Sequence, residues 1–293
     1  LMTIPEIAFN HRKANNAELE IFELESLYQR KGLRHDPTEP HRVAFFALIF
    51  IQKGTGIHHI DFKPYPFKPG SILFVQREQV QAFDFSQQPK GKMLIFTQAF
   101  LDQVHINMRL PNYTPTHLNP HHSPLLDLDA NSKSRIDILV EQMQLEMGQP
   151  NPDPLVVMYL FSALALILHR LRPEVPQDKL SDEQSAKFAR FFEQLQANFH
   201  KTRDANWYAL QLGTTYKTLN LTCKSATNLT VKQLIDAFVI VEIKRRLVVN
   251  QATSQNLAYD FGFEDASNFV KFFKKHSQMT PSQFAKYHTT PKL

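Results

Sequence analysis

The chain is poor in cysteine, and it has no apolar run as long as a typical transmembrane helix. Its single cysteine, Cys223, excludes an intrachain disulfide framework and is typical of a reducing compartment. The longest apolar run, residues 155–168, is shorter than the roughly 20 residues that span a bilayer, so no membrane partner is expected. This run predicts a buried or dimer-forming helix instead.

The N-terminal segment also lacks the features of a secretory signal. Residues 1–25 are polar and acidic, so we expect a cytoplasmic protein. Charged residues make up 21% of the chain and apolar residues 43%, which is an ordinary globular composition and excludes a disordered chain. At 293 residues the chain is long enough for two domains, each with its own core.

The charge is unevenly distributed. From Lys179 onward there are 16 Lys and Arg against 9 Asp and Glu, whereas the preceding residues hold 17 against 19. A basic C-terminal part indicates a nucleic-acid-binding domain, although it does not establish sequence specificity.

Two segments of this basic part repeat one pattern. Residues 208–213 (Tyr-Ala-Leu-Gln-Leu-Gly) correspond to residues 257–262 (Leu-Ala-Tyr-Asp-Phe-Gly), 49 positions later, and the offset becomes 50 beyond the turn. A helical solenoid needs roughly three or more copies, and only two are visible. Each copy predicts a helix, a glycine turn and a second helix, which Thr215 and Asp265 are placed to cap.

The second helix of each copy has an apolar stripe and an opposite polar face. In the second copy the stripe is Ala266, Phe269, Val270 and Phe273. In the first copy it is Tyr216, Leu219 and Cys223. The polar faces predict a DNA interface in the major groove, with Asn and Lys suited to base edges or phosphates. The candidate DNA-binding residues are Lys217, Thr218, Leu221, Lys224, Ser267, Asn268, Lys271, Lys274 and Lys275.

These residues carry a family resemblance. Residues 262–269 (Gly-Phe-Glu-Asp-Ala-Ser-Asn-Phe), followed by 273–275 (Phe-Lys-Lys) and 280–281 (Thr-Pro), resemble the signature of the AraC/XylS family of bacterial transcription regulators. The resemblance covers roughly the last hundred residues. It implies two helix-turn-helix subdomains, joined by a rigid helix near 231–250, with recognition helices in successive major grooves. It also implies that Lys271 occupies the place of a base-contacting arginine.

The sequence departs from the family pattern at four positions, three of them in the first copy. Leu221 and Cys223 stand where arginine and phenylalanine are usual, and Asn228 and Gln278 replace glycines. We therefore expect weaker base discrimination by the first subdomain, with the fold retained, because asparagine tolerates left-handed backbone angles.

The N-terminal part predicts a different fold. Short β-branched and aromatic runs at 43–51, 57–62, 71–75, 80–83 and 92–96 alternate with glycine- and proline-containing turns, as in an antiparallel barrel or sandwich. Residues 60–74 resemble the cupin-type sensor domain that AraC-like proteins often carry. The candidate effector-binding residues are His35, His41, Arg42, Phe45, His58, Phe74 and Phe83. The same phenylalanines can equally be core.

Many cupins are metalloenzymes, so that alternative was weighed. A metal cupin needs a His-x-His motif with a carboxylate and a further histidine on a later strand. His58 and His59 are adjacent and point to opposite faces of a strand, and Gln81 stands where the later histidine is expected. We therefore expect no metal, no cofactor and no catalytic residues.

Between the two parts, residues 132–147 and 155–171 predict helices whose apolar stripes fit either a core or a dimer seam. The proline-containing run 172–178 predicts a linker. We predict three parts: a cupin-like effector domain at 1–125, a helical connector at 126–174 and a DNA-binding domain at 175–293.

Together these features predict an α+β multidomain chain with an N-terminal cupin-like antiparallel β-barrel, a helical connector and a C-terminal all-α double helix-turn-helix domain. The predicted function is sequence-specific transcription regulation, controlled by a small-molecule effector and not enzymatic. The expected partners are double-stranded DNA, a second copy in a homodimer and RNA polymerase. Two alternatives remain: a metal-dependent cupin enzyme with an accessory DNA domain, and a non-specific nucleic-acid binder.

Overall fold

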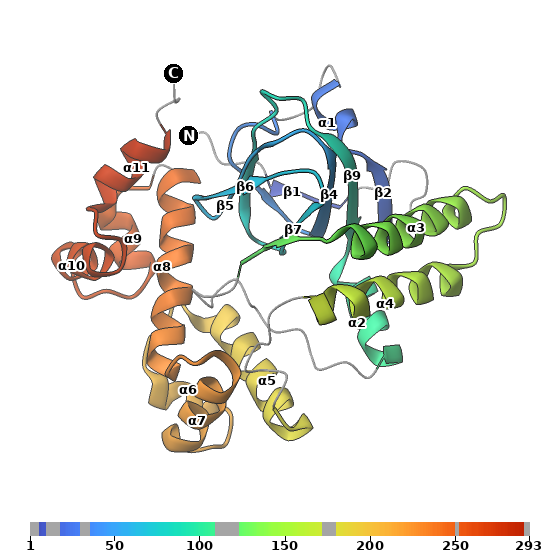
Figure 1. Ribbon diagram of the computed structural model, residues 1–293. Coiled ribbons are helices and arrows are strands. Elements are labelled where there is room, and N and C mark those ends of the chain that lie inside the picture. The colour runs from blue at the N-terminus through green and yellow to red at the C-terminus, as the bar shows by residue number, and fades with distance from the viewer. Residues whose placement is uncertain are drawn as a thin grey trace. The chain divides into compact units, whose positions relative to one another are not determined.

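A computed structural model of the chain describes residues 6–9, 18–29, 36–108, 123–171, 180–249 and 252–289. Within it, the backbone forms two compact units. One contains Pro5–Leu110 and Ser123–Pro173, and the other contains Glu174–Leu293 together with two short segments outside the described residues. The first unit holds the strands and the second is helical (Figure 1).

The first unit is a sandwich of two five-stranded sheets. The first sheet contains, in spatial order, β1 (Glu6–Ile7), β3 (His41–Val43), β8 (Val80–Phe83), β5 (Gly56–Ile60) and β6 (Lys63–Phe67). The second contains β10 (Leu125–Asp127), β7 (Ser71–Val75), β4 (Phe46–Lys53), β9 (Lys90–Phe96) and β2 (Leu19–Glu23). All described pairings are antiparallel except β1 with β3. The predicted fold class is confirmed, as an open cupin-like sandwich rather than a closed barrel.

One predicted strand is shorter than expected, and it is followed by a strand that was missed. The run 57–62 ends as a strand at Ile60, because Asp61 and Phe62 adopt left-handed φ angles of 46° and 68° and turn the chain back. The returning strand β6 contains Pro64 and Pro66, which argue against a strand in sequence. It is tolerated because β6 lies at the edge of its sheet, with only one neighbouring strand.

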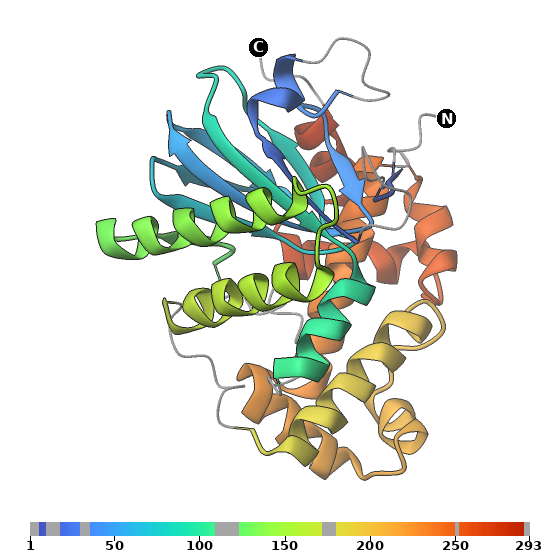
Figure 2. The same cartoon turned by 90° about the vertical axis from the view of Figure 1, so that its right-hand side faces the viewer.

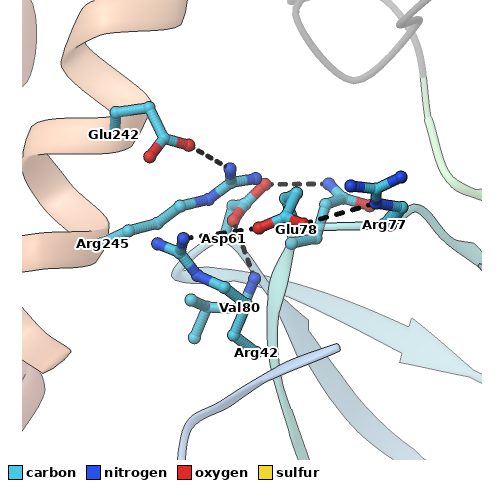
Figure 3. A network of polar contacts seen from close by, with 8 residues as sticks. Arg42, Asp61, Arg77, Glu78, Val80, Glu242 and Arg245 are labelled. Carbon is cyan, nitrogen blue, oxygen red and sulfur yellow. Dashed lines mark hydrogen bonds and ion pairs between the residues drawn. The ribbon is translucent and has the colours of Figure 1, made fainter. Parts of the chain in front are cut away.

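The Asp61 side chain stabilises this turn. Its carboxylate accepts a hydrogen bond from the Val80 backbone N–H at 3.1 Å and one from the Gln79 amide at 2.8 Å. Nearby, Arg42 and Arg77 both bond to Glu78, at 3.5 Å and 3.4 Å (Figure 3). These contacts tie the start of β8 to the β5–β6 hairpin and to β3.

The core of the first unit lies between the sheets. Alternate residues of β4, such as Ala47 and Ile49, point into it and pack with Leu73, Val75 and other residues of the same core cluster. The intervening residues of β4 point to the opposite face, where Phe46 stacks on Phe96 at 5.3 Å.

Helices cover this outward face of the second sheet (Figure 2). They are α2 (Gln98–Met108), α3 (Ala130–Met147) and α4 (Pro154–Leu171), while a short helix, α1 (Glu25–Gln29), follows β2. Phe161 of α4 contacts Phe96 at 4.9 Å and Phe100 of α2 at 5.0 Å. The helices predicted as a connector therefore belong to the sandwich unit, and β10 crosses the boundary predicted at residue 125. The linker predicted at 172–178 lies outside the described residues.

Helix α4 is the one described helix whose length and composition would suffice to cross a membrane. One of its faces is nevertheless buried in this unit, where Phe161 and Leu164 are inaccessible to solvent. This burial fits the first of the two predicted alternatives, a buried helix or a dimer-forming one.

The second unit consists of seven described helices. They are α5 (Asp182–Asn198), α6 (Ala205–Gln211), α7 (Tyr216–Thr227), α8 (Val231–Val249), α9 (Ser254–Asp260), α10 (Ala266–Ser277) and α11 (Pro281–Thr289). Helix α5 was missed in the sequence, although Ser181 and Gln184 form a capping box and Phe188, Phe191 and Leu195 follow at helical spacing.

Candidate nucleic-acid interface

The two predicted helix-turn-helix elements are present. Gly213 and Gly262, at the two turns, have left-handed φ angles of 62° and 64°. The Thr215 hydroxyl accepts the Thr218 backbone N–H at 3.1 Å, and the Asp265 carboxylate accepts that of Asn268 at 2.7 Å. The two predicted N-caps are therefore confirmed, and each orients the start of a recognition helix.

The ends of these helices also correspond. Asn228 and Gln278 both adopt φ angles of 60° and donate their backbone N–H groups to the carbonyl oxygens of Lys224 and Lys274. Residues other than glycine thus fill the left-handed position that ends each helix. This confirms that the departures from the family pattern preserve the fold.

Helix α10 separates buried and exposed residues as its sequence predicts. Phe269 and Phe273 are fully buried, whereas its polar side chains are exposed to solvent except His276 and Ser277, which are partly buried. The exposed candidates on this helix are Ser267, Asn268, Lys271, Lys274 and Lys275. This surface, defined by those five residues, is called the α10 surface below.

Two acidic residues, Glu264 and Asp265, precede the N-terminal end of the α10 surface, and its C-terminal end is basic. The Asn268 side-chain amide donates to Glu264 at 3.4 Å and to Asp265 at 3.3 Å. Lys274 and Lys275 lie in the last turn, where the helix dipole favours positive charge. The basic end therefore has the charge that phosphates favour, and Asn268 and Lys271 lie further toward the N-terminus of the helix.

Helix α7 exposes fewer of the candidate DNA-binding residues than α10, and one of them is apolar. Lys217, Thr218 and Lys224 are exposed, and Leu221 is 57% exposed. Tyr216, expected in the buried stripe, is instead 42% exposed, while Thr222 joins Leu219 and Cys223 in the interior. Tyr216 is the first residue of the helix, where the chain leaves the turn. Burial raises the pKa of the Cys223 thiol to about 12, so it remains protonated.

Helix α8 joins the two elements and is packed against both. Phe238, near its middle, contacts Phe192 of α5 at 5.6 Å, and α8 also contacts α7 and α10. In Figure 1, α6 and α7 lie beside one end of α8 and α9 to α11 beside the other. Its 19 residues span about 28 Å, close to the roughly 34 Å between successive major grooves.

The candidate effector residues fall into three groups. His41, His58 and Phe83 lie on the inner face of the first sheet, and Phe45 belongs to the same buried core. The Phe83 ring lies 4.4 Å from the His58 ring and 6.3 Å from that of His41. The structure therefore brings the rings of His41, His58 and Phe83 together and places Phe45 in the same core.

Two other candidates lie elsewhere. Arg42 points to the opposite face of β3 from His41 and bonds to Glu78, and Phe74 points away from the interior and stacks on Phe46 at 6.1 Å. Both placements follow from the two-residue period of a strand. His35 lies outside the described residues.

His58 is the most unusual polar group in this interior. It is 1% exposed, and its Nε2 is 3.0 Å from Oε1 of Gln81, whereas its Nδ1 has no hydrogen-bond partner among the residues that the structure describes. Burial lowers the pKa of His58 to about 3, against a smaller raising effect of the Gln81 hydrogen bond. The ring is therefore neutral at physiological pH. Among the described residues, no three His, Cys, Asp or Glu side chains are grouped to hold a metal ion.

Comparison with known proteins agrees with this geometry. Residues 208–287 match the family described as a helix-turn-helix domain, and residues 23–186 match that described as the AraC-like ligand binding domain. A chain with both is a transcription regulator of the ligand-controlled class. Since the second match covers more than half of the sequence, the chain belongs to the AraC-like family.

Individual relatives are distant but similar over most of their length. The chain is 23% identical over 251 residues to the transcriptional activator RhaS of Escherichia coli O157:H7, covering 82% of this chain and 85% of that protein. RhaS of Shigella sonnei gives the same values. Among solved structures, ToxT from Vibrio cholerae O395 is 13% identical with a TM-score of 0.45, covering 86% of this chain and 92% of that chain.

Proposed function

We propose that this regulator reads DNA by placing α7 and α10 in successive major grooves, with α10 supplying most of the base discrimination. The observation that carries the proposal is the exposure of Asn268 and Lys271 on α10, opposite the buried Phe269 and Phe273. Asn pairs well with adenine, and Lys donates to guanine.

Helix α7 contributes shape and phosphate contacts in this proposal. Its exposed Lys217 and Lys224 suit phosphates, and Leu221 suits the methyl group of thymine. Lys274 and Lys275 hold the backbone beside α10. The chain acts as a regulator without enzymatic activity, in the cytoplasm.

The effector site proposed for the sandwich is the inner face around His58, His41, Phe83 and Phe45, with Gln81 holding the His58 ring. A buried neutral imidazole gives one directional hydrogen bond, and the neighbouring rings supply apolar contact. An effector bound here controls the protein only if its affinity differs between alternative arrangements of the chain.

A homodimer formed through α3 and α4 is the proposed assembly. The outward sides of these two helices expose large apolar residues, each about half exposed: Ile138, Leu145, Leu155, Tyr159 and Leu166. Exposed apolar residues gathered on one pair of helices are typical of an interaction surface. RNA polymerase is the further proposed partner, in keeping with the activator function named for RhaS.

Selection from random DNA duplexes tests the reading of DNA. The purified chain is expected to enrich two short half-sites in successive major grooves, and to bind them ~10³-fold or more tightly than scrambled duplexes at the same salt concentration. Equal affinity for selected and scrambled duplexes would show non-specific binding and overturn the proposal.

A further inference from the structure

The two helix-turn-helix elements differ in what surrounds their turns. A Cβ atom added at Gly213 would meet nothing within 4 Å, so the first turn is open. One added at Gly262 would lie 3.4 Å from the carbonyl oxygen of His200 and 3.5 Å from that of Lys201. The second turn is therefore packed against the loop of residues 199–203, called the docking loop here.

The docking loop is anchored in the first element. The buried Tyr208 of α6 donates its hydroxyl to the carbonyl oxygen of Thr202 at 3.1 Å, and its ring packs against Phe191 of α5 at 5.8 Å. Thr202 immediately precedes Arg203. Because Arg203 is bonded directly to Thr202, a side chain that contacts Arg203 is connected to α6 through the Thr202–Tyr208 hydrogen bond.

Arg203 holds the aromatic residues of the second element. Its guanidinium carbon lies 3.5 Å from the centroid of the Phe263 ring and 5.3 Å from that of Phe272. Phe263 in turn lies 5.4 Å from the buried Phe269 and 5.3 Å from Phe272, both on α10. The cation therefore sits on the face of a ring that packs directly on the recognition helix.

A second contact fixes the same turn from its other side. Phe199, at the start of the docking loop, contacts Phe261 at 5.6 Å and Phe238 of α8 at 5.2 Å. Arg246 of α8 lies 4.8 Å above the Phe261 ring and 3.6 Å from the Asp260 carboxylate. Without the docking loop, the second element would be attached to the first only through α8. The docking loop is a second attachment between the two elements.

We propose that Arg203 is a positioning residue that docks the second turn onto the first element, and so sets the DNA spacing at which α7 and α10 bind together. The proposal rests on the proposed function. Changing the half-site separation by one base pair moves one site by about 3.4 Å along the DNA and rotates it by about 35°. A rigid pair of elements binds DNA of the altered spacing more weakly, whereas a pair joined only through α8 loses less affinity.

The experiment selects random duplexes with the full chain and compares three variants with the unsubstituted protein. Arg203→Ala removes the cation, and Phe263→Leu removes the ring face while keeping an apolar side chain. Lys201→Ala is the matched control, because it removes an exposed positive charge from the same loop without touching either ring. Circular dichroism verifies that each variant is folded.

The unsubstituted chain and Lys201→Ala are expected to enrich one half-site spacing, about tenfold over spacings one base pair longer or shorter. Arg203→Ala and Phe263→Leu should enrich the same half-sites with that preference reduced to about threefold or less. If either folded variant kept the single spacing, Arg203 would have no positioning role. If the unsubstituted chain enriched no half-sites at all, the proposed function would fail instead.

Discussion

The carboxylate of Asp265 contacts Asn268 twice. One oxygen accepts the Asn268 backbone N–H at 2.7 Å, and the other lies 3.3 Å from its side-chain amide nitrogen. The residue that begins the recognition helix therefore also holds the side chain that we expect to read a base. Helix stability and base recognition are linked at this one position.

Asp265→Ala should destabilise the second element by about 1 kcal/mol, within the 0.5–2 kcal/mol usual for a lost N-cap. Chemical denaturation followed by circular dichroism measures the change. Asp265→Ser retains a capping oxygen and should recover most of the stability. Equal loss in both variants would mean that the carboxylate acts through something other than the cap.

Substitutions on the α10 surface should divide into two classes. Lys271→Ala and Asn268→Ala should each relax base preference within one half-site by about 1–3 kcal/mol. Lys274→Ala should weaken binding to all duplexes by a similar factor. It should also make the negative slope of log affinity against log salt concentration less steep by about 0.9. Titrations of matched and mismatched duplexes at several salt concentrations separate the two effects. Unchanged selectivity in the first two variants would contradict the assignment of α10 to the groove.

His58 should make the stability of the sandwich fall as the solution becomes acidic. The pKa of His58 is about 3 in the folded chain and 6.5 when exposed, so between these values only the unfolded state binds the proton. Unfolding free energy should therefore fall by up to about 1.4 kcal/mol for each pH unit below 6.5, and be independent of this group above it.

The control is a pair of adjacent substitutions. His58→Gln removes the titrating group and should flatten the slope of stability against pH, whereas His59→Gln, on the opposite face of β5, should leave it steep. Denaturation series at pH 4 to 7 give both slopes. A steep slope that persisted in His58→Gln would assign the acid sensitivity to other residues.

The exposed side of α4 should control assembly without contributing to the core. Leu166→Glu is expected to weaken a homodimer at least tenfold with little effect on thermal stability, because Leu166 is 45% exposed within its own unit. Sedimentation velocity over a concentration series measures the dissociation constant. Gln87→Glu adds the same charge at an exposed turn and should leave assembly unchanged; a Leu166→Glu protein with unaltered association would exclude this face.

The duplicated elements could be predicted from the sequence because their signals are local. A glycine with a left-handed angle, a cap three residues before the backbone N–H group that donates to it and an apolar stripe all act within a few residues. For that reason the turns at Gly213 and Gly262 and the caps Thr215 and Asp265 were identified without coordinates. The joining helix near residues 231–250 was instead implied by the family resemblance, and it is observed as Val231–Val249.

Tertiary structure decided what depends on residues distant in the chain. Phe74 and Phe83 look alike in sequence, but only Phe83 faces the interior, since strand register determines which side chains meet. The proline-containing strand β6 forms because it returns from a tight turn and lies at the edge of its sheet. Arg203 has no local signal, because its role is defined by the ring of Phe263, 60 residues later in the chain. Backbone preferences depend on neighbouring residues and can be predicted from them, whereas packing between distant segments is determined only when the whole chain folds.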